Sequence, residues 1–280
     1  MRLAIPKGRL EAKTVTLLAE VGVRVAVEER SYRPASDADD LEVKMFKPQN
    51  IPAIVALGSA DAGFTGHDWV RETGAAVIEV LDLGFDPVRV VAAAAAPDLD
   101  SLRGRAIVAA SEYERLTRGF LEAQGFEYTF LRSYGATEVF PPEDADLIVD
   151  NVSTGQTLRS HGLHEVAEVL RSTTRFIASP AAMRDPALRG RIEALADLMR
   201  AVLRARERVL LEMNVPADRL DAVVAEVPCM KSPTVSPLYG GGGYAVKVAV
   251  PRREVPQIVL RLKALGATDI LEYDLNKIVL

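Results

Sequence analysis

Apolar and polar positions along the first 180 residues alternate between the two-residue period of strands and the longer period of helices. The chain opens with an apolar strand at residues 1–6, and a helix with apolar residues at helical spacing follows at 9–22. The further elements expected here are helices at 50–58, 67–74 and 113–125, and strands at 41–47, 59–66, 88–97, 105–110, 127–133, 145–150 and 165–180. Strands alternating with helices are typical of α/β domains. A second series begins near residue 92, so we expect two α/β lobes with a cleft between them.

The C-terminal part of the chain has a different pattern. A long amphipathic helix is expected at 188–213, and its end overlaps a segment at 209–216 that is also typical of a strand. The elements expected next are a helix at 217–227, strands at 233–238 and 244–251, a helix at 254–266 and a strand at 267–274. This βαββαβ order is the ferredoxin-like pattern. The glycines at 240–243 favour a hairpin loop over a phosphate loop, because no helix follows them.

These elements divide the chain of 280 residues into domains. We expect a first lobe at 1–91 together with 178–208, a second lobe at 92–177, and a small domain at 209–280. A chain of this length is long enough for two compact domains or for one with a smaller addition.

Composition and charge narrow the possible partners. The chain is 49% hydrophobic and 26% charged with a formal net charge of -5, which gives no general attraction for nucleic acid. The amino terminus lacks an apolar signal-peptide segment, and no stretch approaches the roughly 20 apolar residues of a membrane span. We therefore expect a cytoplasmic protein that binds neither nucleic acid nor membrane. Cys229 is the only cysteine, and a packing role is favoured over that of a nucleophile.

The segment DLIVDNVSTGQTLRS, at 146–160, is the main candidate for a binding site. Its strand is expected to end on Asp150, and a turn containing hydroxyls and Gly155 precedes a helix. Backbone amides at such a turn favour an anion such as phosphate, and a glycine allows its close approach. Asp150 suits sugar hydroxyls or a magnesium ion already carried by phosphates. A sugar phosphate is therefore indicated; the alternative is an ordinary turn with Ser153 or Thr154 as N-cap.

Two cations near the amino terminus add to this picture. Lys7 and Arg9 stand just before the first expected helix. Cations near a helix amino terminus oppose its dipole. We therefore expect an anion to compensate them.

Other polar residues have weaker or divided interpretations. His161 and His164 are three residues apart, but no third ligand completes a zinc site, which favours a surface pair. Asp68 is either the N-cap of a helix beginning at Trp69 or a residue beside the substrate. For Asp61 the sequence indicates no definite role.

Four motifs together resemble the ATP phosphoribosyltransferase family in its long form. They are LAIPKGRL, GSADAGFTGHDWVRE, DLIVDNVSTGQTLRSHGL, and KSPTVSPL with LKALGATDIL in the tail. Type I phosphoribosyltransferases have a similar loop, but usually with two adjacent acids where this chain has Asp150 and Asn151. The family resemblance implies an α/β fold with a two-lobed, periplasmic-binding-protein-like catalytic core. It also implies a C-terminal ferredoxin-like regulatory domain.

The resemblance implies a reaction as well. N1 of the adenine of ATP attacks C1 of 5-phosphoribosyl 1-pyrophosphate, giving N1-(5-phosphoribosyl)-ATP and pyrophosphate in the first step of histidine biosynthesis. Mg²⁺ is carried mainly by the substrate phosphates, and no protein ligand to it is assigned. Because the transition state is expected to be oxocarbenium-like, catalysis rests on alignment and charge stabilisation.

Residue roles follow from the same resemblance. The 5-phosphate is expected at Ser153, Thr154, Gly155, Gln156 and Thr157. Asp150 is expected to meet the ribose hydroxyls, and Glu138 to orient ribose or magnesium. Lys7 and Arg9 are expected at the polyphosphate, and Asp68 at the substrate.

The tail resembles the regulatory domain that binds histidine as a feedback inhibitor between neighbouring subunits. Met230, Ser232 and Thr234 fall where the family contacts the effector; alternatively, they only line and cap a sheet edge. The family implies dimers that form hexamers, and the amphipathic helix at 190–211 is one expected contact. Such regulation requires a coupling of typically about 1–3 kcal/mol.

Two segments depart from the family pattern. IVAASEYER, at 107–115, replaces a segment such as IATKYP, and ASDADDL has no counterpart, so the resemblance assigns no substrate contact to either. The alternative function is a non-catalytic regulatory or small-molecule-binding paralogue on the same scaffold. Retention of Lys7, Arg9, Asp150 and the STGQT turn favours catalysis.

Overall fold

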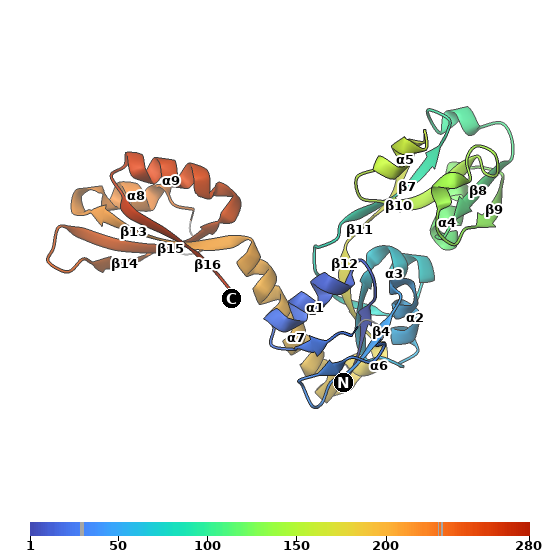
Figure 1. The fold of residues 1–280 in the computed structure, drawn as a ribbon. Helices are drawn as coiled ribbons and strands as arrows, with labels where there is room; N and C mark the ends of the chain where they lie inside the picture. The colour runs from blue at the N-terminus through green and yellow to red at the C-terminus, as the bar shows by residue number, and fades with distance from the viewer. Residues whose placement is uncertain (29–30, 229, 231) are drawn as a thin grey trace. The chain divides into compact units, whose positions relative to one another are not determined.

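The computed structural model describes residues 1–28, 31–228, 230 and 232–280. Cys229, for which the sequence favours a packing role, lies outside the described residues. The chain divides into two compact units, residues 1–196 and 197–280 (Figure 1).

The first sheet of the first unit has the strand order β4-β1-β5-β12-β6. Its strands are β1 (Arg2–Pro6), β4 (Glu42–Phe46), β5 (Ala62–Gly66), β6 (Ile78–Asp82) and β12 (Thr174–Ala178). β1 is parallel to β4 and β5, whereas β12 is antiparallel to β5 and β6. Phe64 and Phe176 lie opposite each other, fully buried, with ring centroids 4.9 Å apart. Burial of each ring contributes about 1.5–3 kcal/mol, which holds the late strand β12 in this sheet.

Helices and short strands complete the surroundings of the first sheet. The helices are α1 (Glu11–Glu20), α2 (Ile51–Ala56), α3 (His67–Thr73), α6 (Pro180–Arg184), α7 (Pro186–Arg206) and the 3₁₀ turn η1 (Pro48–Asn50). β2 (Val25–Ala26) and β3 (Ala35–Ser36) pair antiparallel. We call the first sheet with α1, α2 and α3 the first lobe.

The second sheet has the order β11-β7-β10-β8-β9. Its strands are β7 (Val88–Ala94), β8 (Ile107–Ser111), β9 (Tyr128–Arg132), β10 (Leu147–Val152) and β11 (His164–Ser172). The other elements are α4 (Glu114–Gln124), α5 (Gln156–Ser160) and the 3₁₀ turns η2 (Asp100–Leu102) and η3 (Thr137–Val139). β7 is almost wholly buried, as expected of a strand covered on both faces. We call this sheet with α4 and α5 the second lobe.

The chain passes between the two lobes twice. It leaves β6 for β7 through residues 83–87, and it returns from β11 to β12 at Thr173. Both crossings lie beside the end of β10, because β10 pairs with the first residues of β7. The candidate loop after β10 therefore lies near the hinge of the first unit.

The second unit is a four-stranded antiparallel sheet in the order β14-β15-β13-β16. Its elements are β13 (Arg208–Pro216), η4 (Ala217–Arg219), α8 (Leu220–Glu226), β14 (Thr234–Pro237), β15 (Gly243–Pro251), η5 (Arg252–Glu254), α9 (Val255–Ala264) and β16 (Thr268–Asp274). Every second residue of β13 is buried against α8 and α9, which lie on the same face of the sheet (Figure 1). The strand and helix order is βαββαβ.

The predicted fold class is confirmed in both units. The predicted helix at 188–213 is too long, because it ends at Arg206 and the alternating apolar residues from Arg208 onward form β13. Of the glycines at 240–243, the first three lie in the hairpin between β14 and β15, as predicted, and Gly243 begins β15. The sequence did not predict β2, β3, β6 or α6. The domain boundaries stay a prediction; the sheets change within 83–87 and at Thr173.

No helix in the described part of the chain is both long and apolar enough to cross a membrane.

Candidate functional site

The strand β10 carries Asp150 towards the candidate loop. It continues to Val152, two residues beyond the predicted end, because Asp150, Asn151 and Val152 all pair with β7. The turn occupies residues 153–155, and α5 begins at Gln156. Asp150 therefore projects from a rigid strand, and the flexible part of the site is shorter than the sequence suggested.

Gly155 is favoured by its backbone conformation. Its φ is +70°, which L side chains rarely adopt. A Cβ at this position would lie 2.6 Å from Glu165 Oε1 and 3.1 Å from Arg159 Nη1, which are the ends of flexible side chains that could move aside. Gly155 itself is the N-cap of α5, so the alternative that Ser153 or Thr154 serves as N-cap is wrong.

The remaining loop residues present polar groups to solvent. The exposed side chains of the loop are Ser153, Thr154, Gln156 and Thr157. Thr154 Oγ1 accepts only a long bond, 3.4 Å, from the Gln156 backbone N–H. Because α5 has five residues, its dipole is small, and hydroxyls with backbone N–H groups must account for most of any affinity for an anion.

Asp150 has an unusual electrostatic environment. Burial, together with the negative charges of Glu112 and Glu138, raises the pKa of Asp150 to about 6. The Asn151 backbone N–H, which donates to Asp150 Oδ1 at 2.6 Å, and the Thr137 hydroxyl favour the ionised form. Among the described residues Asp150 forms no ion pair. Such a carboxylate gains from a ligand that brings hydroxyl donors or positive charge.

The two neighbouring acids come from separate turns. Glu138, for which the family resemblance implies a role at ribose or magnesium, lies half-buried in η3. Glu112 lies between β8 and α4, in the segment that departs from the family pattern. Sequence reasoning missed Glu112 because only the pairing of β8 with β10 brings these turns together.

Asp68 is not the cap of a helix. α3 begins at His67 and its N-cap is Gly66, so the predicted N-cap role is wrong. The Asp68 carboxylate is only 5% exposed and accepts hydrogen bonds from Ser172 Oγ at 2.6 Å and from the Tyr113 hydroxyl at 2.7 Å. It therefore joins the first lobe to two elements of the second.

Tyr113 extends this polar network towards Asp150. Its hydroxyl, which donates to Asp68, also accepts from Asn151 Nδ2 at 3.0 Å. The side chain is fully buried, and burial followed by the charge of Asp68 raises the pKa of Tyr113, so the hydroxyl keeps its proton. No sequence pattern indicated a role for Tyr113, because its partners lie in other elements.

A pocket of about 260 Å³ opens beside this network. Arg9, Asp68, Trp69 and Asn151 are among the residues that line it. Two buried oxygens from its lining residues, Asp86 Oδ2 and Thr174 Oγ1, have no hydrogen-bond partner among the described residues, although the other oxygen of Asp86 pairs with Lys13 at 2.7 Å. Buried polar atoms are normally paired, so these oxygens favour a polar ligand here.

Lys7 and Arg9 are not placed alike. Arg9 lines the pocket with Asp68, whereas the Lys7 ammonium lies 4.2 Å from the centroid of the exposed Tyr32 ring. The structure therefore brings Arg9, but not Lys7, into the pocket that contains the polar network.

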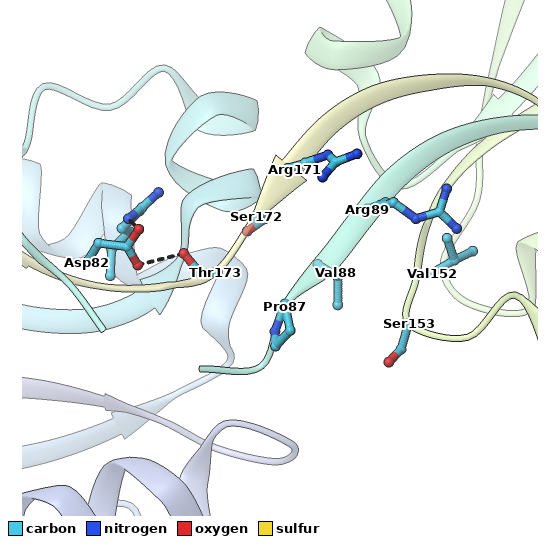
Figure 2. A pocket seen from close by; sticks show the side chains of 10 residues that line it. Asp82, Pro87, Val88, Arg89, Val152, Ser153, Arg171, Ser172 and Thr173 are labelled. Atoms are coloured by element: carbon cyan, nitrogen blue, oxygen red, sulfur yellow. Dashed lines mark hydrogen bonds and ion pairs between the residues drawn. The ribbon is translucent and has the colours of Figure 1, made fainter. Parts of the chain in front are cut away.

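A second pocket, of about 510 Å³, lies beside Ser153 (Figure 2). Arg89 and Arg171 project into it from neighbouring strands, and the two residues are direct partners in the register of β7 and β11. Like charges in this position are destabilising, and Glu165 and Glu168 offset them with ion pairs of 2.7 and 2.8 Å. The sequence could not reveal this pair, because it depends on the strand register.

Asp61 has a structural role. It accepts from the Arg2 backbone N–H at 2.7 Å and from Arg2 Nη2 at 2.6 Å. Burial opposes its ionisation, but these bonds hold the pKa of Asp61 below its usual range. The pair ties β1 to the start of β5.

The expected effector residues lie in the second unit. Met230, Ser232 and Thr234 are exposed, and Thr234 begins β14, which is an edge strand paired with β15. His161 and His164 do not share a helix, because His161 follows α5 and His164 begins β11. Within residues 1–28, 31–228, 230 and 232–280, no three acids, histidines or cysteines are grouped so as to hold a metal ion.

Comparisons with known proteins identify the family of this chain. Residues 47–201 match the family model described as ATP phosphoribosyltransferase, and residues 205–277 match the model described as HisG, C-terminal domain. ATP phosphoribosyltransferase of Pelotomaculum thermopropionicum is 40% identical over 100% of this chain and 99% of the relative. That of Desulforudis audaxviator is 41% identical with the same coverage.

A solved structure is also similar. A chain of the ATP phosphoribosyl transferase (HisG:HisZ) complex from Thermotoga maritima is 28% identical and superposes with a TM-score of 0.63 over 71% of this chain and 98% of that chain. The family matches and the full-length relatives show that this chain belongs to the ATP phosphoribosyltransferase family, in the long form that carries the C-terminal domain.

Proposed function

We propose that Asp150 and the loop at 153–157 form the phosphoribosyl pyrophosphate site of this transferase. The observation that carries the proposal is the half-buried Asp150 carboxylate, which faces two further acids and no cation among the described residues. Ribose hydroxyls would add donors to those that this carboxylate has from Asn151 and Thr137. Ser153, Thr154 and the backbone of Gly155 belong to one short turn, and this turn would then contact the 5-phosphate.

The reaction needs little covalent chemistry from the protein. The lone pair of adenine N1 forms a bond to C1 of the ribose while the C1–O bond breaks, and that electron pair leaves with pyrophosphate. Rate then depends on holding the two substrates in line and on donors around the leaving group. Arg9, which lines the 260 Å³ pocket together with Asn151, is suited to contact polyphosphate.

Magnesium fits this site as an ion that arrives bound to the substrate phosphates. Carboxylate oxygens are donors that Mg²⁺ prefers, and Asp150 and Glu138 offer them without a complete ligand group in the described part of the chain. An ion that arrives with phosphate and water ligands suits such an arrangement. When bound, it neutralises charge on the pyrophosphate.

Lys7 has a different place in the proposal. Its ammonium lies over Tyr32, outside the set of residues that line the 260 Å³ pocket. We assign it to long-range attraction of polyphosphate. Lys7→Ala should then reduce kcat/KM several-fold, with a loss that shrinks as salt is raised; normal kinetics at low salt would return Lys7 to an ordinary surface role.

Regulation by histidine belongs to the same proposal. Met230, Ser232 and Thr234 are exposed on or before the edge strand β14, where a neighbouring subunit can complete a site. The proposal places the enzyme in the cytoplasm as dimers that form hexamers, with α7, which ends at Arg206 and not at 211 as predicted, as one contact. Thr234→Ala should weaken histidine inhibition and leave the uninhibited rate unchanged.

The activity assay follows ultraviolet absorbance of the product, with ATP, phosphoribosyl pyrophosphate, magnesium and a pyrophosphatase. A rise that histidine suppresses is the expected result. A rise that histidine does not change would remove the effector assignment. No rise, in protein shown by calorimetry to bind phosphoribosyl pyrophosphate, would favour the non-catalytic alternative.

A further inference from the structure

Helix α3 of the first lobe contacts the start of α4 in the second lobe. The Trp69 and Tyr113 rings are stacked, with centroids 4.5 Å apart and planes 21° apart. The neighbouring Asp68 accepts the hydrogen bond of the Tyr113 hydroxyl. These two contacts come from one end of α3, and a third contact lies one turn further along the helix.

That third contact is made by Glu72. Its Oε1 accepts from the Arg115 backbone N–H at 3.1 Å, and its Oε2 accepts from the Leu116 backbone N–H at 3.0 Å. The first N–H groups of a helix have no partner inside the helix, and Tyr113, the N-cap of α4, supplies no side-chain bond. A carboxylate is the most favourable partner at this positive end. Glu72 therefore caps a helix that belongs to the other lobe.

The cap continues into the candidate site through two residues. Tyr113 directly precedes α4, so holding the start of the helix also holds the Tyr113 hydroxyl between Asp68 and Asn151. A hydroxyl has one donor, which here goes to Asp68, while it accepts from Asn151. Asn151 in turn donates its backbone N–H to Asp150. A continuous series of bonds therefore runs from α3 to the expected ribose ligand.

We propose that Glu72 is a positioning residue for the transferase reaction: by capping α4 across the lobes it keeps Tyr113, Asn151 and Asp150 aligned with the first lobe. This inference rests on the proposed function, because it takes Asp150 as a substrate ligand. Glu72 itself touches no substrate. It sets the arrangement of the two lobes in which Arg9 and Asp150 act on the same reacting pair.

Because the loop at 153–157 lies in the second lobe, loss of the Glu72 cap should affect kcat and not the affinity for phosphoribosyl pyrophosphate. Ser153 to Thr157 belong wholly to the second lobe, so phosphoribosyl pyrophosphate can bind there whether or not the lobes are held together. Alignment with ATP, by contrast, needs both lobes, and small misplacements of reacting groups reduce rates by up to about 100-fold. Loss of the cap should therefore lower kcat and leave the Kd for phosphoribosyl pyrophosphate nearly unchanged.

The test compares three full-length variants. Glu72→Ala removes both acceptors, and Glu72→Gln keeps one acceptor oxygen and most of the shape. Glu114→Gln is the matched control, because Glu114 is an acid in the first turn of α4 that bonds Arg118 and Arg132 within the second lobe. We expect kcat to fall about 10- to 100-fold in Glu72→Ala, to fall less in Glu72→Gln, and to stay near the wild-type value in Glu114→Gln.

Calorimetry without ATP separates positioning from folding and from the proposed function. A Kd for phosphoribosyl pyrophosphate within about twofold of wild type in all three variants is expected. An unchanged kcat in Glu72→Ala would overturn the inference. The inference would also be overturned if the affinity for phosphoribosyl pyrophosphate and the melting temperature fell together. Failure of wild-type protein to bind phosphoribosyl pyrophosphate would instead reject the proposed function on which it rests.

A double-mutant cycle with Tyr113→Phe tests the connection itself. This change removes the hydroxyl and keeps the stacked ring. If Glu72 acts through Tyr113, the kcat of Glu72→Gln/Tyr113→Phe will be close to that of the more impaired single variant, because residues in one network are not additive. Multiplication of the two separate losses would contradict the connection.

Discussion

Asp61 and Asp150 are both carboxylates placed by strands of the first unit, and their surroundings have opposite charge. Asp61 precedes β5 and is held by Arg2, which keeps its pKa low. Asp150 lies in β10 beside Glu112 and Glu138, and its pKa is raised to about 6. Asp61 therefore has its cationic partner within the fold, whereas a partner for Asp150 has to come from a ligand.

The largest effect expected from this comparison concerns substrate affinity. Asp150→Ala removes the acceptor proposed for two ribose hydroxyls, and hydrogen bonds to a charged group contribute about 1.5–3 kcal/mol each. Calorimetry should show phosphoribosyl pyrophosphate binding weakened about 100-fold or more. Asp144→Ala, at an exposed acid of the same lobe, is the control and should bind normally. Equal affinity in wild type and Asp150→Ala would remove Asp150 from the site.

The loop hydroxyl should have a smaller effect on the same measurement. Thr154→Ala removes an exposed hydroxyl from the proposed phosphate turn, and we expect affinity to fall about tenfold. Thr129→Ala, which removes an exposed hydroxyl from β9, is the matched control. A similar loss in both variants would mean that the turn has no special part in binding.

The pH dependence of binding should reflect the raised pKa of Asp150. Only the ionised carboxylate accepts fully from ribose hydroxyls, so affinity should rise as pH increases through about 6. Below that pH, affinity should fall about tenfold per pH unit until other groups titrate. Asp150→Asn should lose this dependence. An identical pH profile in the variant would assign the titration to another group.

Substitution of Asp61 should lower the free energy of unfolding and leave the affinity for phosphoribosyl pyrophosphate unchanged. Asp61→Asn removes the charge from its bonds with Arg2, which is largely exposed, so we expect about 1 kcal/mol less stability at pH 7. Since the pKa of Asp61 is lowered by folding, its contribution is present above the unfolded pKa and is lost as pH falls through the folded one. The deficit of the variant should therefore shrink in acid. Thermal unfolding at several pH values measures it, and a deficit that grows in acid would contradict the assignment.

The last expected effect is of similar size and has the opposite sign. Asp150→Asn should stabilise the unliganded protein at pH 8 by about 1 kcal/mol, since it removes a partly buried charge beside two acids. Folding raises the pKa of Asp150 to about 6, so the penalty in wild-type protein shrinks as pH falls through about 6 and is gone below the unfolded pKa, where the advantage of the variant should disappear. A variant less stable than wild type at pH 8 would show that the carboxylate has an internal partner.

The local sequence pattern predicted most elements of this fold, because the spacing of apolar residues and the glycines that end helices can be recognised within each segment. The central strands β1, β7 and β10 and the helix α4 were all predicted, within a few residues. The short strands β2 and β3 were not, since two residues carry no period. The end of α7 at Arg206 was also missed, because an amphipathic helix and an alternating strand share apolar positions at this junction.

The candidate site was predictable only where a motif is continuous in sequence. Asp150 and the loop at 153–157 stand in one such motif, and Arg9 in another. Glu72, Glu112 and Tyr113 act through partners about 40 residues away, and only the pairing of β8 with β10 and the contact of α3 with α4 bring these partners together. The opposite characters of Asp61 and Asp150 were hidden for the same reason, because each depends on charges contributed by other strands and turns.

The most direct test of the central claim is the rate of product formation by Asp150→Asn and Asp61→Asn, measured by ultraviolet absorbance at equal concentrations of folded protein. The account predicts that kcat/KM falls about 100-fold or more in Asp150→Asn and stays within about twofold of wild type in Asp61→Asn. Near-normal turnover in Asp150→Asn would contradict the assignment of this acid, and of the loop beside it, to the phosphoribosyl pyrophosphate site.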